Sequence, residues 1–211
     1  MRDAILDAAE QRFADRGFEG TSMRDIAADA GLKNQASLYH YFLNKQQLYE
    51  AVLRRGVDTL APLWQGAGDA IGASGGDVQR LGTVAAHLDG VLDYLAEHPH
   101  LARLIERAGL EDDRYVRGAV SRLLRPLYAA GVRVLEDAGG PWQPSELPHL
   151  AAGLYHLIFG YFANASLLQA VMGEDPHSPD MLARQRRFLT TAIARLLGAE
   201  ERPPSAPRII S

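Results

Sequence analysis

The chain has 211 residues, of which 47% are hydrophobic, and it carries a formal net charge of −4 at pH 7. This length allows one large or two small domains, and this hydrophobic content excludes a globally disordered chain. The chain contains no cysteine, which excludes disulfide bonds, a thiolate zinc site and a cysteine nucleophile. Met1 runs straight into a charged segment, which argues against a signal peptide, and no apolar run reaches the roughly 18 residues of a membrane span. We therefore expect a cytoplasmic protein with no membrane segment.

Residues 2–16 have the pattern of an amphipathic helix. Ile5, Ala9 and Phe13 recur every four residues, so they share one face that would pack on the following helices. Gly17 ends this helix, and Phe18 returns to the core.

Residues 22–45 have the pattern of two short helices joined by a tight turn, followed by the start of a third helix. Ser22 is a good N-cap for the first, and Gly31 suits the left-handed conformation that ends it. Asn34 is a good N-cap for the second. Two short helices at a steep angle, joined by a turn that contains glycine, form a helix-turn-helix.

Leu38 and Phe42 lie four residues apart on one face of the second helix, which leaves the polar side chains of this region for other contacts and the outer face. A recognition helix needs small or amide side chains to reach base edges, and hydroxyls and cations to hold phosphates. The two lysines of the chain flank this helix. We expect DNA contacts from Ser22, Lys33, Asn34, Gln35, Ala36, Ser37, Tyr39, His40 and Lys45.

The segments AILDAAEQRFADRGFEGTSMRDIAADAG, SLYHYF and NKQQLYEAV resemble the DNA-binding domain of the TetR family of bacterial transcriptional repressors. The resemblance covers about 50 residues, from about Ile5 to Val52. The turn from Gly31 to Ser37 is one residue longer than the usual form, and Ala36-Ser37 stands where Gly-Thr is common. Tyr39, His40 and Lys45 lie beyond this insertion.

Residues 1–55 contain eight basic and eight acidic residues, so a basic bulk charge is not what indicates DNA binding here. The prediction rests on where the individual side chains are placed. We expect modest non-specific affinity and a visible salt dependence, because only a few phosphates would be neutralised.

The remaining chain predicts an all-α protein with about nine helices and no strands. Further helices are expected at 45–65, 77–97, 101–109, 114–138, 145–171 and 180–197, with a flexible turn at 66–76. The expected domains are a three-helix helix-turn-helix DNA-binding domain at 1–46, a helical effector-binding and dimerisation domain at 47–198, and a disordered tail at 199–211.

The last two long helices each carry an extended apolar seam. Taken singly, these residues are explained by ordinary core packing. Two adjacent helices with wide apolar faces also suit a four-helix interface between two subunits, which is where the family resemblance places it. A homodimer presents two recognition helices, so we expect a palindromic operator in double-stranded DNA.

Aromatic and polar side chains alternate in the C-terminal region and could line an effector pocket. The alternative is that most are core or boundary residues. The expected lining residues are Trp64, His87, Tyr94, Tyr128, His156 and Phe159. No histidine spacing matches a zinc pair, and no GxSxG, P-loop or HExxH motif occurs, so we expect no metal, no cofactor and no enzyme activity.

These patterns favour a DNA-binding transcriptional regulator, and among regulators a repressor that a small-molecule effector releases from its operator. The sequence does not identify this effector. A DNA-binding regulator without a ligand, controlled by abundance or by a protein partner, is the alternative. A fully packed C-terminal interior would favour that alternative. A helical ligand carrier that no longer binds DNA is a third reading.

Overall fold

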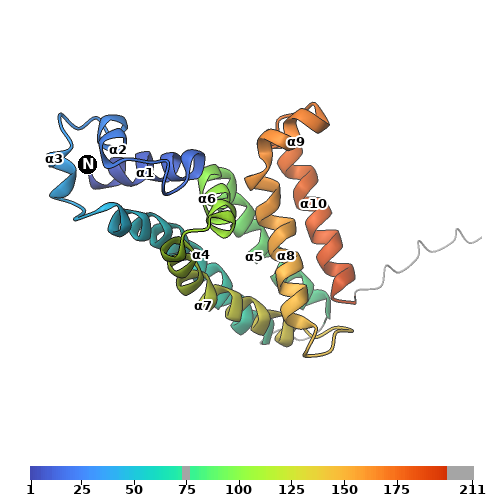
Figure 1. Ribbon diagram of the computed structural model, residues 1–211. Coiled ribbons are helices and arrows are strands. Elements are labelled where there is room, and N and C mark those ends of the chain that lie inside the picture. The colour runs from blue at the N-terminus through green and yellow to red at the C-terminus, as the bar shows by residue number, and fades with distance from the viewer. Residues whose placement is uncertain (73–76, 199–211) are drawn as a thin grey trace, which may run out of the picture.

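The computed structural model describes residues 1–72 and 77–198, and within these ranges the protein is all-helical, as predicted (Figure 1). The described helices are α1 (Arg2–Arg16), α2 (Met23–Asp29), α3 (Ala36–Tyr39), α4 (Lys45–Gly72), α5 (Asp77–Glu97), α6 (Pro99–Leu110), α7 (Arg114–Ala138), α8 (Leu147–Ala163), α9 (Ala165–Met172) and α10 (Pro179–Leu196). The predicted disordered tail at 199–211 and residues 73–76 of the predicted turn lie outside the described residues.

The N-terminal end is built on an aromatic cluster between α1 and the start of α4. The Phe13 and Phe18 rings meet the Tyr49 ring edge-on, at centroid distances of 4.9 and 5.2 Å. Ile5, Ala9 and Phe13 are fully buried, which confirms the predicted apolar face of α1. Figure 1 shows α1, α2 and α3 together at one end of the molecule, where α4 leaves them for the other helices.

The long helix α4 continues where a turn was predicted. The expected turn began at residue 66, but α4 runs on to Gly72. Glycine lowers helix propensity by about 1 kcal/mol relative to alanine. Here α4 packs along both α7 and α5, and this tertiary packing overrides the local preference. The helix therefore connects the N-terminal end to the C-terminal bundle without a break.

Helices α6 and α7 have boundaries that local sequence explains. Helix α7 starts where Asp113 Oδ1 accepts hydrogen bonds from the backbone N–H groups of Tyr115 at 2.7 Å and Val116 at 3.0 Å. It ends at Gly139, whose φ of 71° is readily adopted only by glycine. The short helix α6 begins at Pro99, two residues before its predicted start, because proline is favoured at the first helical position.

The predicted single helix at 145–171 is wrong, because the chain bends there. Helices α8 and α9 meet at Asn164 with an angle of 75° between them. At the bend the Gly160 carbonyl accepts both the Asn164 side-chain amide at 2.9 Å and the Asn164 backbone N–H at 3.1 Å. This bend raises the number of described helices to ten, against about nine predicted.

One hydrophobic core runs through both ends of the protein. It extends from Ile5 in α1 to Ile193 in α10. Within the described ranges, no single helix is long and apolar enough to cross a membrane, although α8 and α9 together pass that test as a bent pair.

Candidate nucleic-acid interface and interior cavity

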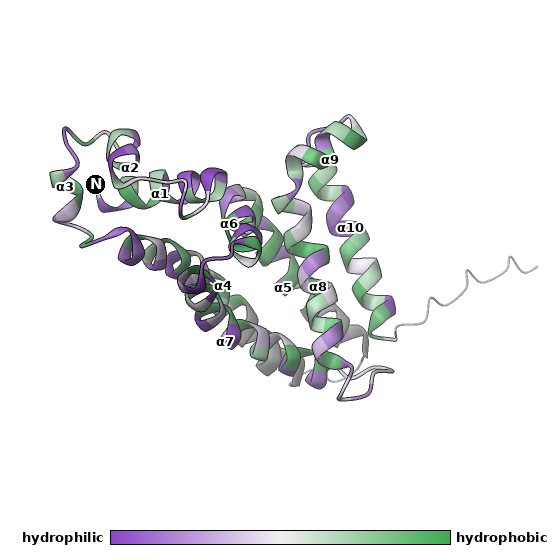
Figure 2. Ribbon diagram, in the orientation of Figure 1, coloured by the Kyte–Doolittle hydropathy of each residue, from purple (hydrophilic) through white to green (hydrophobic). Residues whose placement is uncertain are grey.

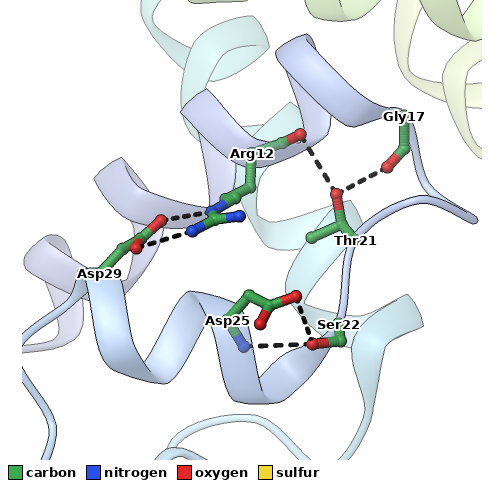
Figure 3. A network of polar contacts seen from close by, with 6 residues as sticks. All are labelled: Arg12, Gly17, Thr21, Ser22, Asp25 and Asp29. Carbon is green, nitrogen blue, oxygen red and sulfur yellow. Dashed lines mark hydrogen bonds and ion pairs between the residues drawn. The ribbon is translucent and has the colours of Figure 1, made fainter.

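Helix α2 is held against α1 by polar contacts (Figure 3). The Arg12 guanidinium forms a two-pronged ion pair with the Asp29 carboxylate. The buried Thr21 hydroxyl lies within hydrogen-bonding distance of the backbone carbonyls of Gly17 at 2.8 Å and Arg12 at 3.1 Å. These contacts fix the angle between the two helices, which a helix-turn-helix needs in order to present its second helix.

Both ends of α2 are capped as the sequence indicates. Ser22 Oγ accepts the Asp25 N–H at 3.1 Å and donates to the Asp25 carboxylate at 2.7 Å. At the other end, Gly31 has a φ of 70°, and the Leu32 N–H donates to the Ala27 carbonyl at 2.9 Å. This is a Schellman motif, which turns the chain sharply towards α3.

Helix α3 is a single turn, shorter than the predicted helix that reached Phe42. Asn34 Oδ1 accepts the Ser37 N–H at 3.0 Å, which confirms the predicted capping role of Asn34. Leu38 and Phe42 are buried with exposed fractions of 0% and 3%, so the inner face of the unit is as predicted. After Tyr39 the chain leaves the helix, yet Phe42 N–H still donates to the Leu38 carbonyl at 3.1 Å.

Most of the predicted DNA-contacting side chains around α3 are exposed. The Gln35 amide donates to the Tyr39 hydroxyl at 3.0 Å, which joins these two side chains on the surface. Gln35 and Ser37 are half-buried. The exposed residues of the predicted set are Ser22, Lys33, Asn34, Ala36, Tyr39 and His40.

The environment of Lys45 differs from that of the other residues predicted to contact DNA. Its ammonium group donates to the Phe18 carbonyl at 2.8 Å and lies over the Phe18 ring, 4.3 Å from the centroid. The ammonium group is therefore turned towards the loop after α1. Sequence reasoning placed it at the phosphate backbone, because a contact between partners 27 positions apart leaves no local pattern.

Two arginines that sequence reasoning did not select lie in the same region. The Arg2 guanidinium lies 5.3 Å from the centroid of the Phe42 ring, close to the end of α3. Arg24 is exposed in the first turn of α2, beside the α2 cap. The position of Arg24, two residues after Ser22, was a signal available in the sequence, whereas the approach of Arg2 to Phe42 was not.

The C-terminal bundle contains a cavity of about 270 Å³ between α5, α7, α8 and α10. Its walls are almost entirely aliphatic and aromatic. The lining residues are Val84, His87, Leu88, Leu124, Leu127, Tyr128, Gly131, Val134, Leu135, Ala138, Ala151, Ala152, Leu154, Tyr155, Ile158, Phe159, Ile193 and Leu197.

Three of the six predicted effector residues line this cavity: His87, Tyr128 and Phe159. Tyr94 does not, because its ring packs on His98 at a centroid distance of 4.3 Å. His156 is 70% exposed and also lies outside the lining. The side chain of Trp64 lies outside the described residues.

Tyr155 was not among the predicted lining residues, although it directly precedes His156 in the sequence. It stacks on Phe159 at a centroid distance of 4.8 Å. Burial, followed by the neighbouring Glu106 carboxylate, raises the pKa of the Tyr155 hydroxyl. The orientation of α8, which no local pattern specifies, decides that Tyr155 rather than His156 faces inwards.

The junction between α6 and α7 contacts the N-terminal helices directly. The Phe18 N–H donates to both Glu111 carboxylate oxygens, at 3.1 and 3.3 Å. The Tyr115 hydroxyl donates to the Gln46 carbonyl at 2.9 Å, and its ring lies 5.7 Å from the Phe18 ring. A displacement of α7, which forms one wall of the cavity, would therefore reach the loop after α1 and the start of α4.

Large hydrophobic side chains are exposed on the last three helices. Figure 2 shows hydrophobic residues along α8 and α9. The exposed set comprises Leu157, Leu167, Val171, Met172 and Phe188. Leu157 and Met172 belong to the predicted seam, whereas Leu167, Val171 and Phe188 lie outside it.

The N-terminal unit and the helical bundle behind it define a helix-turn-helix protein with a second, cavity-containing helical domain. Residues 5–52 match the model of the family described as bacterial regulatory proteins, tetR family. This match assigns the N-terminal segment, residues 5–52, to the DNA-binding domain of that family.

Individual relatives agree with this assignment over different lengths. The repressor KstR2 of Mycolicibacterium smegmatis is 47% identical over 64 residues, which is 30% of this chain and 31% of that protein. The chain thus aligns with about a third of that relative. The probable transcriptional regulator YttP of Bacillus subtilis is 26% identical over 180 residues and 84% of each chain.

A solved structure has the same fold over nearly the whole chain. The regulator FadR from Bacillus subtilis, in complex with stearoyl-CoA, superposes with a TM-score of 0.58 and 15% identity, covering 95% of this chain and 100% of that one. At this identity the match concerns the fold alone.

Proposed function

We propose that the protein is a transcriptional regulator that binds operator DNA as a homodimer and leaves it when a small molecule occupies the C-terminal cavity. One observation carries this proposal. The chain combines exposed polar side chains around α3 with an apolar cavity, and α7, which lines that cavity, contacts the start of α4 through Tyr115. In this proposal the protein is a repressor, and ligand binding releases it from the operator.

The DNA-binding face is centred on α3. Ala36 and Ser37 are small enough for close approach to base edges, and Gln35 can pair with adenine. Tyr39 and His40 can donate to phosphates, with Lys33, Arg2 and Arg24 as cations around them.

Lys45 acts in this proposal chiefly by positioning the start of α4, because its ammonium group already holds the Phe18 carbonyl. The free hydrogens of that ammonium leave room for a phosphate contact in addition.

Dimerisation uses the exposed apolar side chains of α8, α9 and α10. Contiguous exposed apolar groups of this kind mark interaction surfaces in proteins. A two-fold axis through them presents two copies of α3, so the proposed operator is an inverted repeat with half-sites about one helical turn, roughly 34–36 Å, apart.

Induction requires that the ligand bind better to the conformation that fits DNA poorly. Helix α7 supplies Leu124, Leu127 and Tyr128 to the cavity and Tyr115 to the contact with α4. A ligand that moves α7 would thereby change the spacing of the two recognition helices.

The test is selection of bound duplexes from a random library with purified protein at moderate salt, followed by titration of the recovered site with candidate ligands. Recovery of an inverted repeat, and its release by a ligand that fills the cavity, is the expected outcome. Failure to enrich any sequence with folded, dimeric protein would remove the DNA-binding part of the proposal. Unchanged operator affinity at saturating ligand would remove the induction part.

A regulator without a ligand is the second candidate. It would be favoured by a packed interior, whereas the bundle has a cavity of about 270 Å³. Apolar cavities of this size are rare in close-packed interiors, which favours the ligand-responsive form.

A further inference from the structure

Few polar side-chain groups line the cavity. Of its 18 lining residues only His87, Tyr128 and Tyr155 carry a polar side-chain group, and none is Lys, Arg, Asp or Glu. An ionised ligand head placed among these described residues would lose its water without gaining a counter-charge, which is strongly unfavourable. The chemistry of the three polar groups then decides what the cavity accepts.

The hydrogen of the Tyr128 hydroxyl is already used in a hydrogen bond within the protein. It donates to the Pro148 carbonyl at 2.5 Å and thereby links α7 to the start of α8. Tyr128 is 43% exposed while it also lines the cavity, so it lies at the opening. Its oxygen lone pairs remain, so towards a ligand this hydroxyl acts as an acceptor.

The His87 imidazole also donates a hydrogen bond within the protein. Its Nδ1 lies 2.8 Å from the Thr83 carbonyl oxygen, and since a carbonyl can only accept, Nδ1 must carry the hydrogen. In the uncharged imidazole this leaves Nε2 as an acceptor.

Tyr155 adds a negative neighbour. Its hydroxyl lies beside the Glu106 carboxylate, whose Oε1 is also 3.9 Å from His156 Nδ1. A carboxylate therefore lies next to the α8 side of the cavity, and it would repel an anionic ligand head.

We infer that the cavity takes an uncharged, mainly apolar ligand whose polar group is a hydrogen-bond donor such as a hydroxyl, and that it rejects carboxylates and other anions. The inference names the ligand class of the effector site and so rests on the proposed function only for the consequence of binding. The volume of about 270 Å³ lies just below the usual range of roughly 300–1,000 Å³ for ligand pockets, which favours a small ligand.

The experiment uses the full-length protein and two competitors of equal chain length. The uncharged dye N-phenylnaphthylamine reports occupancy by its fluorescence, and decanol and decanoate are titrated against it below their micellar concentrations. At about pH 8 a carboxylic acid is fully ionised, so the two competitors differ mainly in the charge of the head group. We expect decanol to displace the dye at a concentration at least about tenfold lower than decanoate.

A pair of histidine variants tests the acceptor. His87→Leu removes the Nε2 acceptor and should weaken decanol binding by about 2- to 10-fold, the net value of one hydrogen bond. His149→Leu, at an exposed position on α8 outside the lining, is the matched control and should leave decanol binding unchanged.

The outcomes separate the two proposals. Displacement by decanoate at the same or lower concentration, or no displacement by decanol, would overturn the assigned ligand class, whatever happens to the DNA. If decanol binds and decanoate does not, but the operator complex is unaffected by decanol, the ligand class stands and release by such a ligand fails.

Discussion

The Glu111 carboxylate accepts the backbone N–H of Phe18 with both oxygens, joining the end of α6 to the loop that follows α1. Glu111 is the C-cap residue of α6, 93 residues from Phe18 in sequence. The contact lies between the cavity-containing bundle and the aromatic cluster beneath the helix-turn-helix. It is therefore a point at which the two halves of the protein can be uncoupled.

Glu111→Ala should lower the free energy of unfolding by about 1–3 kcal/mol, because the partly buried Phe18 N–H loses its acceptor. Chemical denaturation of the two proteins measures the difference. Glu111→Gln is the control, since its amide oxygen can still accept and should restore most of the loss. Equal stability of Glu111→Ala and wild type would show that the contact contributes nothing.

Tyr39→Phe should weaken operator binding by about 2- to 10-fold, because one hydroxyl that donates to a phosphate is lost. The unfolding temperature should stay nearly unchanged, since Tyr39 is 44% exposed and its only described hydroxyl partner is the surface amide of Gln35. Fluorescence anisotropy with the selected operator gives the affinity. Tyr161→Phe, on α8, controls for loss of a tyrosine hydroxyl elsewhere, and undiminished binding by Tyr39→Phe would refute the phosphate contact.

Lys45→Ala should reduce both stability and operator affinity, unlike Tyr39→Phe. Its ammonium group holds the Phe18 carbonyl and the Phe18 ring, and hydrogen bonds to charged groups are worth about 1.5–3 kcal/mol. Thermal unfolding and anisotropy are measured on the same preparation. Lys33→Ala, which removes an exposed lysine, should affect only the DNA affinity. An unfolding temperature of Lys45→Ala equal to that of wild type would contradict the structural role.

Capping and periodicity could be predicted from sequence around the helix-turn-helix because they depend on neighbours within about four residues. Ser22, Asn34 and the Leu38–Phe42 face are where they were expected. The inward turn of Lys45 could not be predicted, since its partner is 27 residues away.

The cavity was harder to predict, because its wall depends on how four helices are rotated against one another. Choosing aromatic and histidine residues found His87, Tyr128 and Phe159, but most of the wall is aliphatic and had no distinguishing pattern. The bend at Asn164 was also missed, because the apolar spacing of residues 145–171 continues across it.

The ion pair between Arg12 and Asp29 predicts a pH dependence of stability. Its hydrogen bond to Arg12 lowers the pKa of Asp29 below the ordinary value of 3.8. A depressed folded-state pKa stabilises the fold above the unfolded value, and this contribution is lost as the pH falls through the folded value. Asp29→Asn should therefore lower the unfolding temperature at neutral pH, and the difference from wild type should shrink as the pH falls below the ordinary value of 3.8 and through the depressed folded-state pKa. A difference that is constant with pH would contradict the ionic origin.

Phe188→Glu tests the dimer that the proposed operator symmetry requires. Phe188 is 52% exposed on α10, within the apolar set left uncovered by α8, α9 and α10. A carboxylate buried there at an interface would lack a partner, so the dimer should be weakened by about 2 kcal/mol or more, which exceeds tenfold in Kd. Analytical ultracentrifugation over a concentration series measures this constant. Arg187→Glu, about 100° round the same helix, controls for added negative charge. If Phe188→Glu dimerises as tightly as wild type, α10 is not at the interface, and the inverted repeat needs another source of symmetry.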